Sequence, residues 1–251
     1  MLRFVKFLDF SFLYLSKSAI LNRLSNGDFK NCSLHFIAAS SFYNKFCDLR
    51  LRDFWNRGIL VADSRPLSLY LRTKKSDLSQ IRGTDFMRDF LSYYSSNSFL
   101  IGGDPNSIRV IRDVFEGINP KLKIVGTIHP AISSLNLKEE LKFWSQEIQQ
   151  SEATCVWIGL GSPKQDYVAQ ELSLLIEPPI IAVGAAFDYL SNLKTEAPIL
   201  FRIFFLEWLF RLISEPNRLW KRYLLGNFYF ITLIVRDISR NLSEYFVKSC
   251  D

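Results

Sequence analysis

Asp63 is the clearest candidate for acid–base chemistry in this sequence. It closes the apolar run GILVAD, residues 58–63, and is followed by the segment SRP. A carboxylate held rigidly at the end of a buried strand can take a proton from a substrate hydroxyl, which is the task of a general base. The same residue could equally cap the N-terminus of a following helix. Asp188, after the run PIIAVGAAF, has the same two interpretations, and a structural or ribose-binding role is favoured there.

Two glycine-rich junctions could hold a phosphate group. The first, GGDPNS at 102–107, contains Gly102, Gly103 and Asp104, and the second, GLGSPKQ, occupies 159–165. Because glycine has no Cβ, the backbone can approach a pyrophosphate closely, and a helix that begins just beyond offers N–H groups and the positive end of its dipole. An ordinary strand-to-helix turn explains the first junction equally well.

The second junction places unusual side chains in a first helical turn. Lys164 and Gln165 follow Gly161 at a position where the helix dipole favours acids. This misfit suggests a ligand, because a cation there could neutralise the diphosphate of a leaving nucleotide. A solvated surface lysine is nearly as good an explanation.

The sequence lacks the patterns of several common enzyme sites. No G-x-G-x-x-G follows a predicted strand, no G-x-S-x-G elbow is present, and there are two histidines, so a nicotinamide site and a Ser-His-Asp hydrolase are disfavoured. The four cysteines form no C-x-x-C pair, which disfavours a zinc site or a disulfide framework. No Asp-x-Asp pair is present to hold a divalent metal on a sugar nucleotide, so we expect neither a metal nor another cofactor.

The elements that would position these residues alternate along the chain. Short apolar runs predict strands and amphipathic segments between them predict helices, as in a mostly parallel sheet covered on both faces. In such a sheet the candidate residues meet at the carboxyl edge, where ligands bind. We therefore expect a Rossmann-like α/β domain over residues 1–198. The predicted strands are 34–40, 58–63, 98–103, 123–128, 154–161 and 179–187, and the predicted helices are 105–115, 137–150 and 163–175.

Residues 199–251 form a helical C-terminal appendage of a different composition. Aromatic residues recur there at helical spacing among basic ones, namely Phe201, Phe204, Phe205 and Trp208 beside Arg202, Arg211, Arg218, Lys221 and Arg222. Core packing would explain the aromatic stripe, but the basic residues suit the surface of an anionic bilayer. We expect that removing the appendage would leave a folded core. The longest uncharged apolar run, 224–235, is too short to span a bilayer.

Taken in order, these segments resemble the WecG/TagA/CpsF glycosyltransferases, glycosyltransferase family 26. The resemblance covers residues 34–225 and is most specific in GLGSPKQD at 159–166 and EWLFRLISEPNRLWKRYL at 207–224. The other matching segments are ADSRP (62–66), RGTDFM (82–87), FLIGGDP (99–105), LKIVGT (122–127), VGAAFDYL (183–190) and AP (197–198).

The resemblance implies a metal-independent inverting transferase. It would move an N-acetylmannosamine-type, uronic or hexosyl unit from a UDP-sugar to a polyprenyl-diphosphate-linked acceptor, at the cytoplasmic face of the bacterial membrane, in surface polysaccharide or teichoic acid synthesis. Carried onto this sequence, the family's base falls on Asp63 and its appendage arginines on Arg211, Arg218 and Arg222. The family's PKQ residues fall on Pro163, Lys164 and Gln165. The complete set of donor-binding residues that we predict adds Gly102, Gly103, Asp104, Gly161, Gly184, Phe187 and Asp188.

Four positions depart from the family's pattern. Ala38 and Ser40 stand where many relatives have threonine and asparagine, Ser64 replaces a glycine, and Glu196 stands where relatives often have a basic residue. These departures leave the donor sugar open, and Ala38 and Ser40 motivate an alternative, a catalytically inactive nucleotide-sugar-binding module or subunit.

The expected partners are a UDP-sugar, the lipid-linked acceptor and an anionic membrane surface. The net charge of +6 also admits nucleic acid, but the aromatic residues cluster on amphipathic helices, so we expect no nucleic-acid partner. Homo-oligomer formation is left open.

Overall fold

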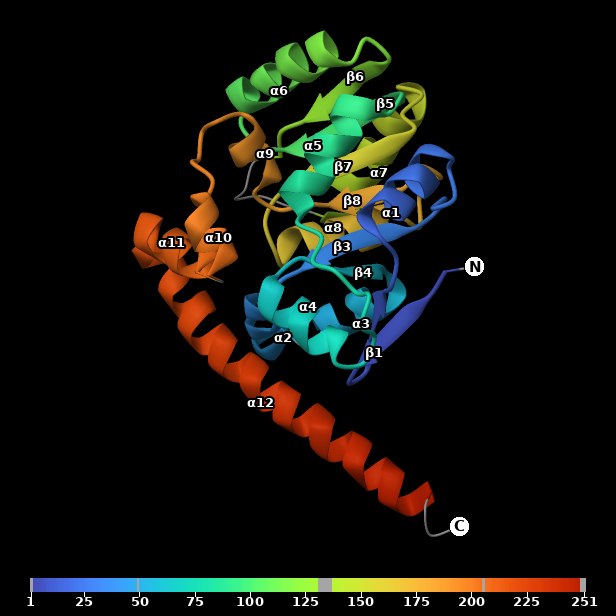
Figure 1. The fold of residues 1–251 in the computed structure, drawn as a ribbon. Helices are drawn as coiled ribbons and strands as arrows, with labels where there is room; N and C mark the ends of the chain where they lie inside the picture. Colours follow the sequence, from blue (N-terminus) through green and yellow to red (C-terminus); the bar gives the residue numbers. More distant parts are fainter. Residues whose placement is uncertain (1, 49, 131–136, 205, 249–251) are drawn as a thin grey trace.

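The computed structural model describes residues 2–48, 50–130, 137–204 and 206–248. Its centre is an eight-stranded sheet in the order β1-β2-β4-β3-β8-β7-β5-β6 (Figure 1). β1 and β2 pair antiparallel, and the other pairings among the described strands are parallel. The strands are β1 (Phe4–Phe7), β2 (Phe10–Leu13), β3 (Ser33–Ile37), β4 (Ile59–Ala62), β5 (Ser96–Gly102), β6 (Leu122–Ile128), β7 (Cys155–Gly159) and β8 (Ile180–Ala182).

Helices cover both faces of this sheet. Leu34 and Phe36 of β3 share one core cluster with α1, α5, α6 and α9, whereas Val156 and Ile158 of β7 pack on the other face against α7 and α8. The bounds are α1 (Lys17–Ser25), α5 (Gly83–Tyr93), α6 (Pro105–Ile118), α7 (Leu137–Gln150), α8 (Lys164–Leu172) and α9 (Ala186–Leu190). This is the mostly parallel, doubly covered α/β fold that the sequence predicts.

The central strands β3 and β8 lie side by side, and the chain leaves them toward opposite faces. After β3 come a short 3-10 helix, η1 (Ala39–Ser41), and α2 (Phe42–Cys47), which packs on the face opposite α9. After β8 the chain turns at Gly184, where φ is +63°, and enters α9. A crevice therefore opens between the two strand ends, at the place where open α/β sheets bind ligands.

The N-terminal hairpin is an element that the sequence analysis did not predict. β1 and β2 extend the sheet beyond β4 and bury Phe7, Phe10 and Phe12. These rings join a core cluster with α2, α3 (Arg50–Arg57) and α4 (Arg65–Arg72). The predicted strand at 179–187 is also shorter than expected, because its second half forms α9.

The C-terminal segment is helical, as predicted, and consists of α10 (Ile199–Ile203), α11 (Glu207–Ser214) and α12 (Pro216–Lys248). α12 crosses the body beside η1 and α2 and runs toward the hairpin (Figure 1). Phe230 of α12 is buried against Phe7 and Phe42. Asp237 accepts a hydrogen bond from the N–H of Leu8 (2.8 Å). Removal of residues 199–251 would therefore expose part of this core, and the expectation that the remainder stays folded remains a prediction.

Candidate active site

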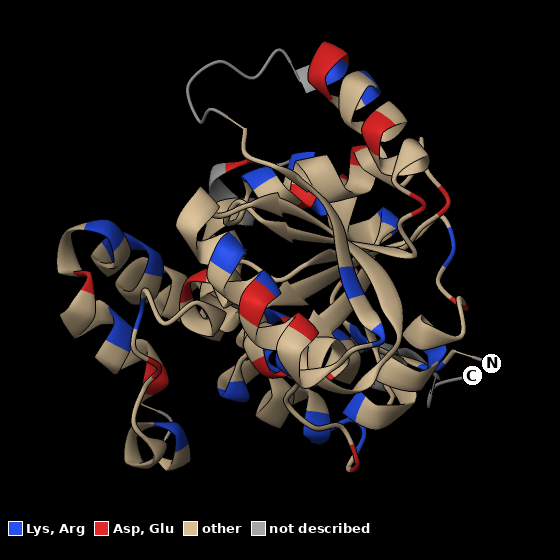
Figure 2. Cartoon of the chain, turned by 90° about the horizontal axis from the view of Figure 1, so that it is seen from above, with Lys and Arg blue, Asp and Glu red and all other residues tan. Residues whose placement is uncertain are grey.

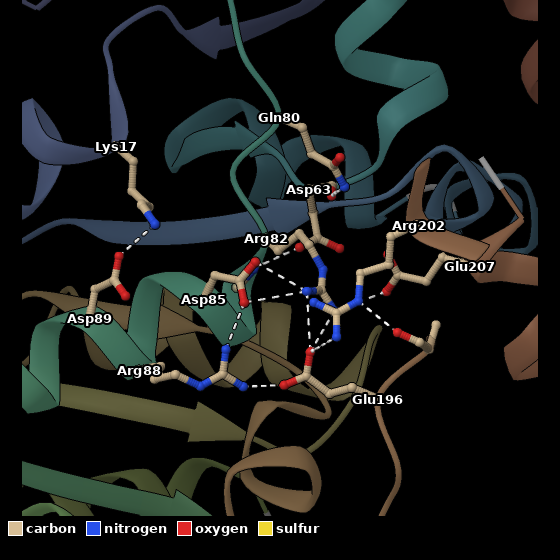
Figure 3. Close-up of polar contacts among 12 residues, drawn as sticks. Lys17, Asp63, Gln80, Arg82, Asp85, Arg88, Asp89, Glu196, Arg202 and Glu207 are labelled. Atoms are coloured by element: carbon tan, nitrogen blue, oxygen red, sulfur yellow. Dashed lines mark hydrogen bonds and ion pairs between the residues drawn. The ribbon is translucent and has the colours of Figure 1, made fainter. Parts of the chain in front are cut away.

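Asp63 lies directly after β4, at the carboxyl edge of the sheet. Its N–H donates to the carbonyl of Ile37 (2.9 Å), and the N–H of Gly83, the first residue of α5, donates to its Oδ1 (2.7 Å). Gln80 donates to the Asp63 carbonyl (2.7 Å), and Figure 3 shows the carboxylate close to Arg82. Ser64, not Asp63, precedes α4, and no side chain caps that helix. Asp63 therefore does not cap α4, the helix that follows it in sequence. It does accept the first N–H of α5, so it can cap that helix instead.

The surroundings of Asp63 change its proton affinity. Burial raises the pKa of the Asp63 carboxyl, whereas the positive charge of Arg211 and the hydrogen bond from Gly83 act in the opposite direction. A raised pKa makes the ionised carboxylate a stronger proton acceptor, and the neighbouring cations favour that ionised form.

Asp63 lines two of three adjoining cavities at the carboxyl edge. The glycine cavity, of about 430 Å³, is lined by Gly102, Gly103, Gly161, Gly184, Lys164, Asp188 and Arg218, among others. The central cavity shares Gly161, Gly184 and Arg218 with it and adds Asp63, Ser162, Gln165, Arg211 and Arg222. The appendage cavity lies on the other side of Asp63 and is lined by Arg65, Gln80, Arg82, Glu207, Trp208, Arg211 and Tyr223. Most of the predicted site residues are therefore brought together.

The glycines of the first cavity occupy conformations that other residues avoid. Gly102, Gly103 and Gly161 have φ values of +101°, +67° and +75°. A Cβ on Gly102 would lie 2.8 Å from the backbone oxygen of Gly159, so a side chain cannot be added without moving backbone. His129 Nδ1 lies 3.1 Å from the Gly103 oxygen, in agreement with its interpretation as a hydrogen-bonded turn residue.

Two predicted donor-binding residues, Phe187 and Asp104, have structural contacts at the glycine cavity. Phe187 is fully buried, and a Cβ on Gly103 or Gly159 would lie within 3.0 Å of its ring. Asp104 caps α6 by accepting from the N–H of Asn106 (2.9 Å), and hydrogen bonding from Ser107 lowers the pKa of Asp104. Its carboxylate lines the cavity but is already engaged.

The loop from Gly161 to Gln165 is also bonded internally. Pro163 follows a cis peptide bond after Ser162 and precedes α8. The side chain of Gln165 is buried and accepts from the N–H of Gly161 (3.1 Å). Lys164 is exposed and lines the glycine cavity.

A chain of charges links the glycine cavity to the appendage. Asp188 pairs with Lys194 (2.7 Å), Lys194 pairs with Glu215 (3.2 Å), and Glu215 pairs with Arg218 (2.7 Å). Arg218 thus reaches the cavity edge from the start of α12. The sequence analysis missed Lys194 and Glu215, which lack a recognisable motif.

The other two predicted arginines lie deeper. The Arg211 guanidinium lies over the Tyr189 ring, 5.1 Å from its centroid, and pairs with Glu207 (2.5 Å). Arg222 donates to the hydroxyl of Ser41 (3.2 Å), and burial lowers the pKa of Arg222. All three predicted arginines line the central cavity.

A network of ion pairs around Arg82 joins the appendage to α5 (Figure 3). The Arg82 side chain is 11% exposed and pairs with Asp85 (3.1 Å), Glu196 (3.3 Å) and Glu207 (3.2 Å). Glu196 also pairs with Arg88 and with Arg202 (3.1 Å). The acidic residue at position 196 is therefore compensated by three arginines. No sequence pattern identified Arg82 as a site residue, although it lies in the segment RGTDFM.

The remaining departures from the family's pattern also lie at the site. The hydroxyl of Ser64 accepts from the N–H of Ala39 (2.8 Å) and so ties the end of β4 to that of β3. Ala38 and Ser40 line both the central and the appendage cavities. Gly226 lets α12 approach this point, because a Cβ there would lie 2.8 Å from the Ser40 oxygen.

The site as a whole combines the partly buried Asp63 carboxylate with many cations, several of which pair with the acids Asp188, Glu207 and Glu215. Within the part of the chain that the structure describes, no cluster of three or more His, Cys, Asp or Glu residues could hold a metal ion. Such an arrangement can accept a proton at Asp63 and stabilise negative charge at the glycine and central cavities.

A comparison with protein families agrees with this geometry. Residues 5–244 of the 251-residue chain match the family model described as Glycosyl transferase WecG/TagA/CpsF family. The match includes nearly all of the hairpin, the three cavities and most of α12. The chain therefore belongs to the WecG/TagA/CpsF family of glycosyltransferases.

Proposed function

We propose that the protein transfers a sugar from a UDP-sugar to a polyprenyl-diphosphate-linked acceptor, with inversion at the anomeric carbon and without a metal ion. The observation that carries this proposal is the position of Asp63 between the central cavity, which is continuous with the glycine cavity and its cations, and an aromatic cavity on the appendage. Two substrates entering from opposite sides would meet at this carboxylate.

In this mechanism Asp63 takes the proton of an acceptor hydroxyl. The hydroxyl oxygen forms a bond to the anomeric carbon on the face opposite UDP, while the bond from that carbon to the diphosphate oxygen breaks and UDP leaves with the electron pair. Lys164, Arg218 and Arg222 would stabilise the charge that develops on the diphosphate. Supporting this assignment, all three line the cavities on the donor side of Asp63.

The appendage is proposed to lie on an anionic membrane, at the inner face of the bacterial plasma membrane. In the described residues, no helix is both long and apolar enough to cross a bilayer. α12 nevertheless carries an exposed apolar stripe on the side away from the body: Leu224, Phe228, Ile231, Val235, Ile238 and Leu242. Phe204 and its neighbours on α10 are also exposed, whereas Phe205 lies outside the described residues.

The net positive charge of residues 199–251 favours an anionic bilayer, and not a second copy of the chain, as the partner that covers this stripe. Residues 199–251 contain eight Lys and Arg against five Asp and Glu, and Figure 2 shows basic segments on the appendage helices. Lys221 and Arg236 are exposed beside the stripe. Of the five basic residues expected at the bilayer, however, four face acids or cavities instead, namely Arg202, Arg211, Arg218 and Arg222, so Lys221 remains from that set. Sedimentation with anionic but not with neutral vesicles would support this placement.

The decisive experiment compares Asp63→Asn with the wild type. The variant keeps the shape that accepts from Gly83 but cannot take a proton, so transfer should fall at least about a hundredfold while UDP binding persists. The assay offers a panel of UDP-sugars with polyprenyl-diphosphate acceptors in excess EDTA and identifies products by mass spectrometry. Asp89→Asn is the matched control, because Asp89 pairs with Lys17 outside the cavities.

Three outcomes would contradict the proposal. If Asp63→Asn retained more than half of the wild-type transfer rate, Asp63 would not be the general base. Loss of wild-type activity in EDTA with recovery on adding magnesium would show that a metal meets the diphosphate charge. Nucleotide-sugar binding without turnover of any panel member would favour the inactive module instead.

A further inference from the structure

A buried polar network lies beneath the loop that joins β7 to α8. His35 of β3 is fully buried, and its Nδ1 lies 2.9 Å from Oδ1 of Asp166 in α8. Its Nε2 lies 2.9 Å from Oγ of Ser33, and the Ser33 hydroxyl donates to Oε1 of Gln170 (2.9 Å). Four buried polar side chains thus connect the centre of the sheet to α8.

The outer end of this network reaches the central cavity. Asp166 Oδ2 accepts from the hydroxyl of Ser162 (2.6 Å), and the Ser162 oxygen accepts from Nδ2 of Asn44 in α2 (3.1 Å). Ser162 lines the central cavity together with Asp63 and Gln165. The Asp166 carboxylate therefore connects the loop between β7 and α8, through Ser162, to the buried ring of His35.

Burying the polar imidazole ring of His35 in this strand costs free energy unless its nitrogens form hydrogen bonds. All five residues of β3 are buried, and a polar ring in such a strand is tolerated when its nitrogens have partners. The ring is also closely covered, because a Cβ on Gly58 would lie 2.6 Å from it. Ser162, His35 and Asp166 do not form a nucleophilic triad, because the Ser162 hydroxyl donates to Asp166 and not to the imidazole.

We propose that His35 is a positioning residue for the donor diphosphate: through Asp166 it fixes Ser162 and the first turn of α8. Lys164 and Gln165 begin that turn, so a fixed loop presents both to the ligand without reorganisation. The identity of the ligand rests on the proposed function, whereas the effect of His35 on the loop does not.

Two amide substitutions separate this role from ordinary packing. In His35→Asn the amide nitrogen falls near the position of Nδ1 and can still donate to Asp166. In His35→Gln it falls near Nε2 and can bond to Ser33 instead. UDP affinity of the intact protein should fall about tenfold in His35→Gln and stay close to wild type in His35→Asn, while the KM for the acceptor is unchanged in both.

Hydrogen exchange of the amides at 161–166, measured without substrate, provides the second readout. Exchange there should accelerate in His35→Gln and not in His35→Asn. Gly58→Ala displaces the same ring without changing a hydrogen-bonding group, and it should reproduce the accelerated exchange if His35→Gln fails to fold.

The proposal would be overturned if both amide variants lost thermal stability and UDP affinity equally, or if exchange at 161–166 stayed unchanged in His35→Gln and Gly58→Ala. If the wild-type protein does not bind UDP, the proposed donor is wrong, and the exchange measurement alone still decides the role of His35.

Discussion

The cavities on the two sides of Asp63 are built in different ways. The glycine cavity is formed by residues that directly follow strands, and its shape depends on backbone conformation at Gly102, Gly103 and Gly161. The appendage cavity is formed by side chains from distant parts of the chain. Arg82, for example, bonds to Glu196 and Glu207, which are 114 and 125 residues away.

This difference has a consequence for how each side can vary. A cavity defined by backbone and glycine tolerates few substitutions, because an added Cβ meets fixed atoms, as at Gly102, or sits at a positive φ that other residues avoid, as at Gly161 and Gly184. A cavity defined by side chains and ion pairs can change its residues while the sheet stays the same. We therefore expect the proposed donor side to be common to related enzymes and the proposed acceptor side to carry more of the specificity.

The largest effect is expected from Gly102→Ala. The new Cβ would lie 2.8 Å from the Gly159 oxygen, at a φ of +101° that alanine disfavours. The two glycine junctions must then separate, and UDP binding should weaken by roughly a hundredfold. Calorimetric titration with UDP measures this change.

Gly117→Ala in α6 provides the matched control, because a Cβ there meets nothing within 4 Å. Unchanged UDP affinity in Gly102→Ala would show that the backbone of the glycine cavity does not set donor binding, and the contrast between the two cavities would fail.

The same difference explains how much the sequence could predict. The apolar runs identified the six parallel strands, and the junctions after them correctly placed Asp63 and the glycines at the carboxyl edge of the sheet, because these signals are local. Arg82, Trp208 and Tyr223 were missed as site residues because their roles arise from contacts between distant segments. The hairpin was missed because β1 and β2 are four residues each and their pattern, FVKF and FSFL, is too short to stand out.

Residues of the appendage show where composition misleads. The arginine-rich aromatic segment predicted an appendage that faces the membrane and the acceptor, with core packing as the alternative, and the structure divides its residues among different surroundings. Phe230 completes the core, Trp208 lines a cavity beside Tyr223, and Phe228 is exposed. A helical period identifies which residues share a face, but not what that face contacts.

A smaller effect, confined to the acceptor side, is expected from Trp208→Ala. The indole packs near the Tyr223 ring, with centroids 6.3 Å apart, in the cavity that adjoins Asp63. An aromatic surface of this kind can hold the apolar face of a sugar ring, so its loss should raise the KM for the acceptor about tenfold and leave UDP affinity unchanged. Steady-state kinetics with each substrate varied in turn measures both.

Trp220→Ala is the control for this variant, because Trp220 is exposed on α12 and does not line the cavity. With a short-chain acceptor it should behave like the wild type. Loss of UDP affinity in Trp208→Ala would mean that the two sides are not independent.

The smallest effect expected is on the pH dependence of stability, and it tests Asp63 itself. Burial raises the pKa of Asp63 in the folded protein above that of an ordinary aspartate. The folded state therefore holds this proton to higher pH than the unfolded chain does. The contribution to stability is complete below the unfolded pKa and is lost as the pH rises through the folded pKa.

Asp63→Asn lacks this titration. Between the unfolded and the folded pKa of Asp63, the melting temperature of the variant should therefore rise relative to that of the wild type as the pH increases. Above the folded pKa the difference between the two melting temperatures should stay constant. Thermal melting of both proteins from about pH 4 to pH 8 measures the trend. A variant less stable than the wild type by the same amount at every pH would show instead that the carboxylate serves Gly83 as a structural cap.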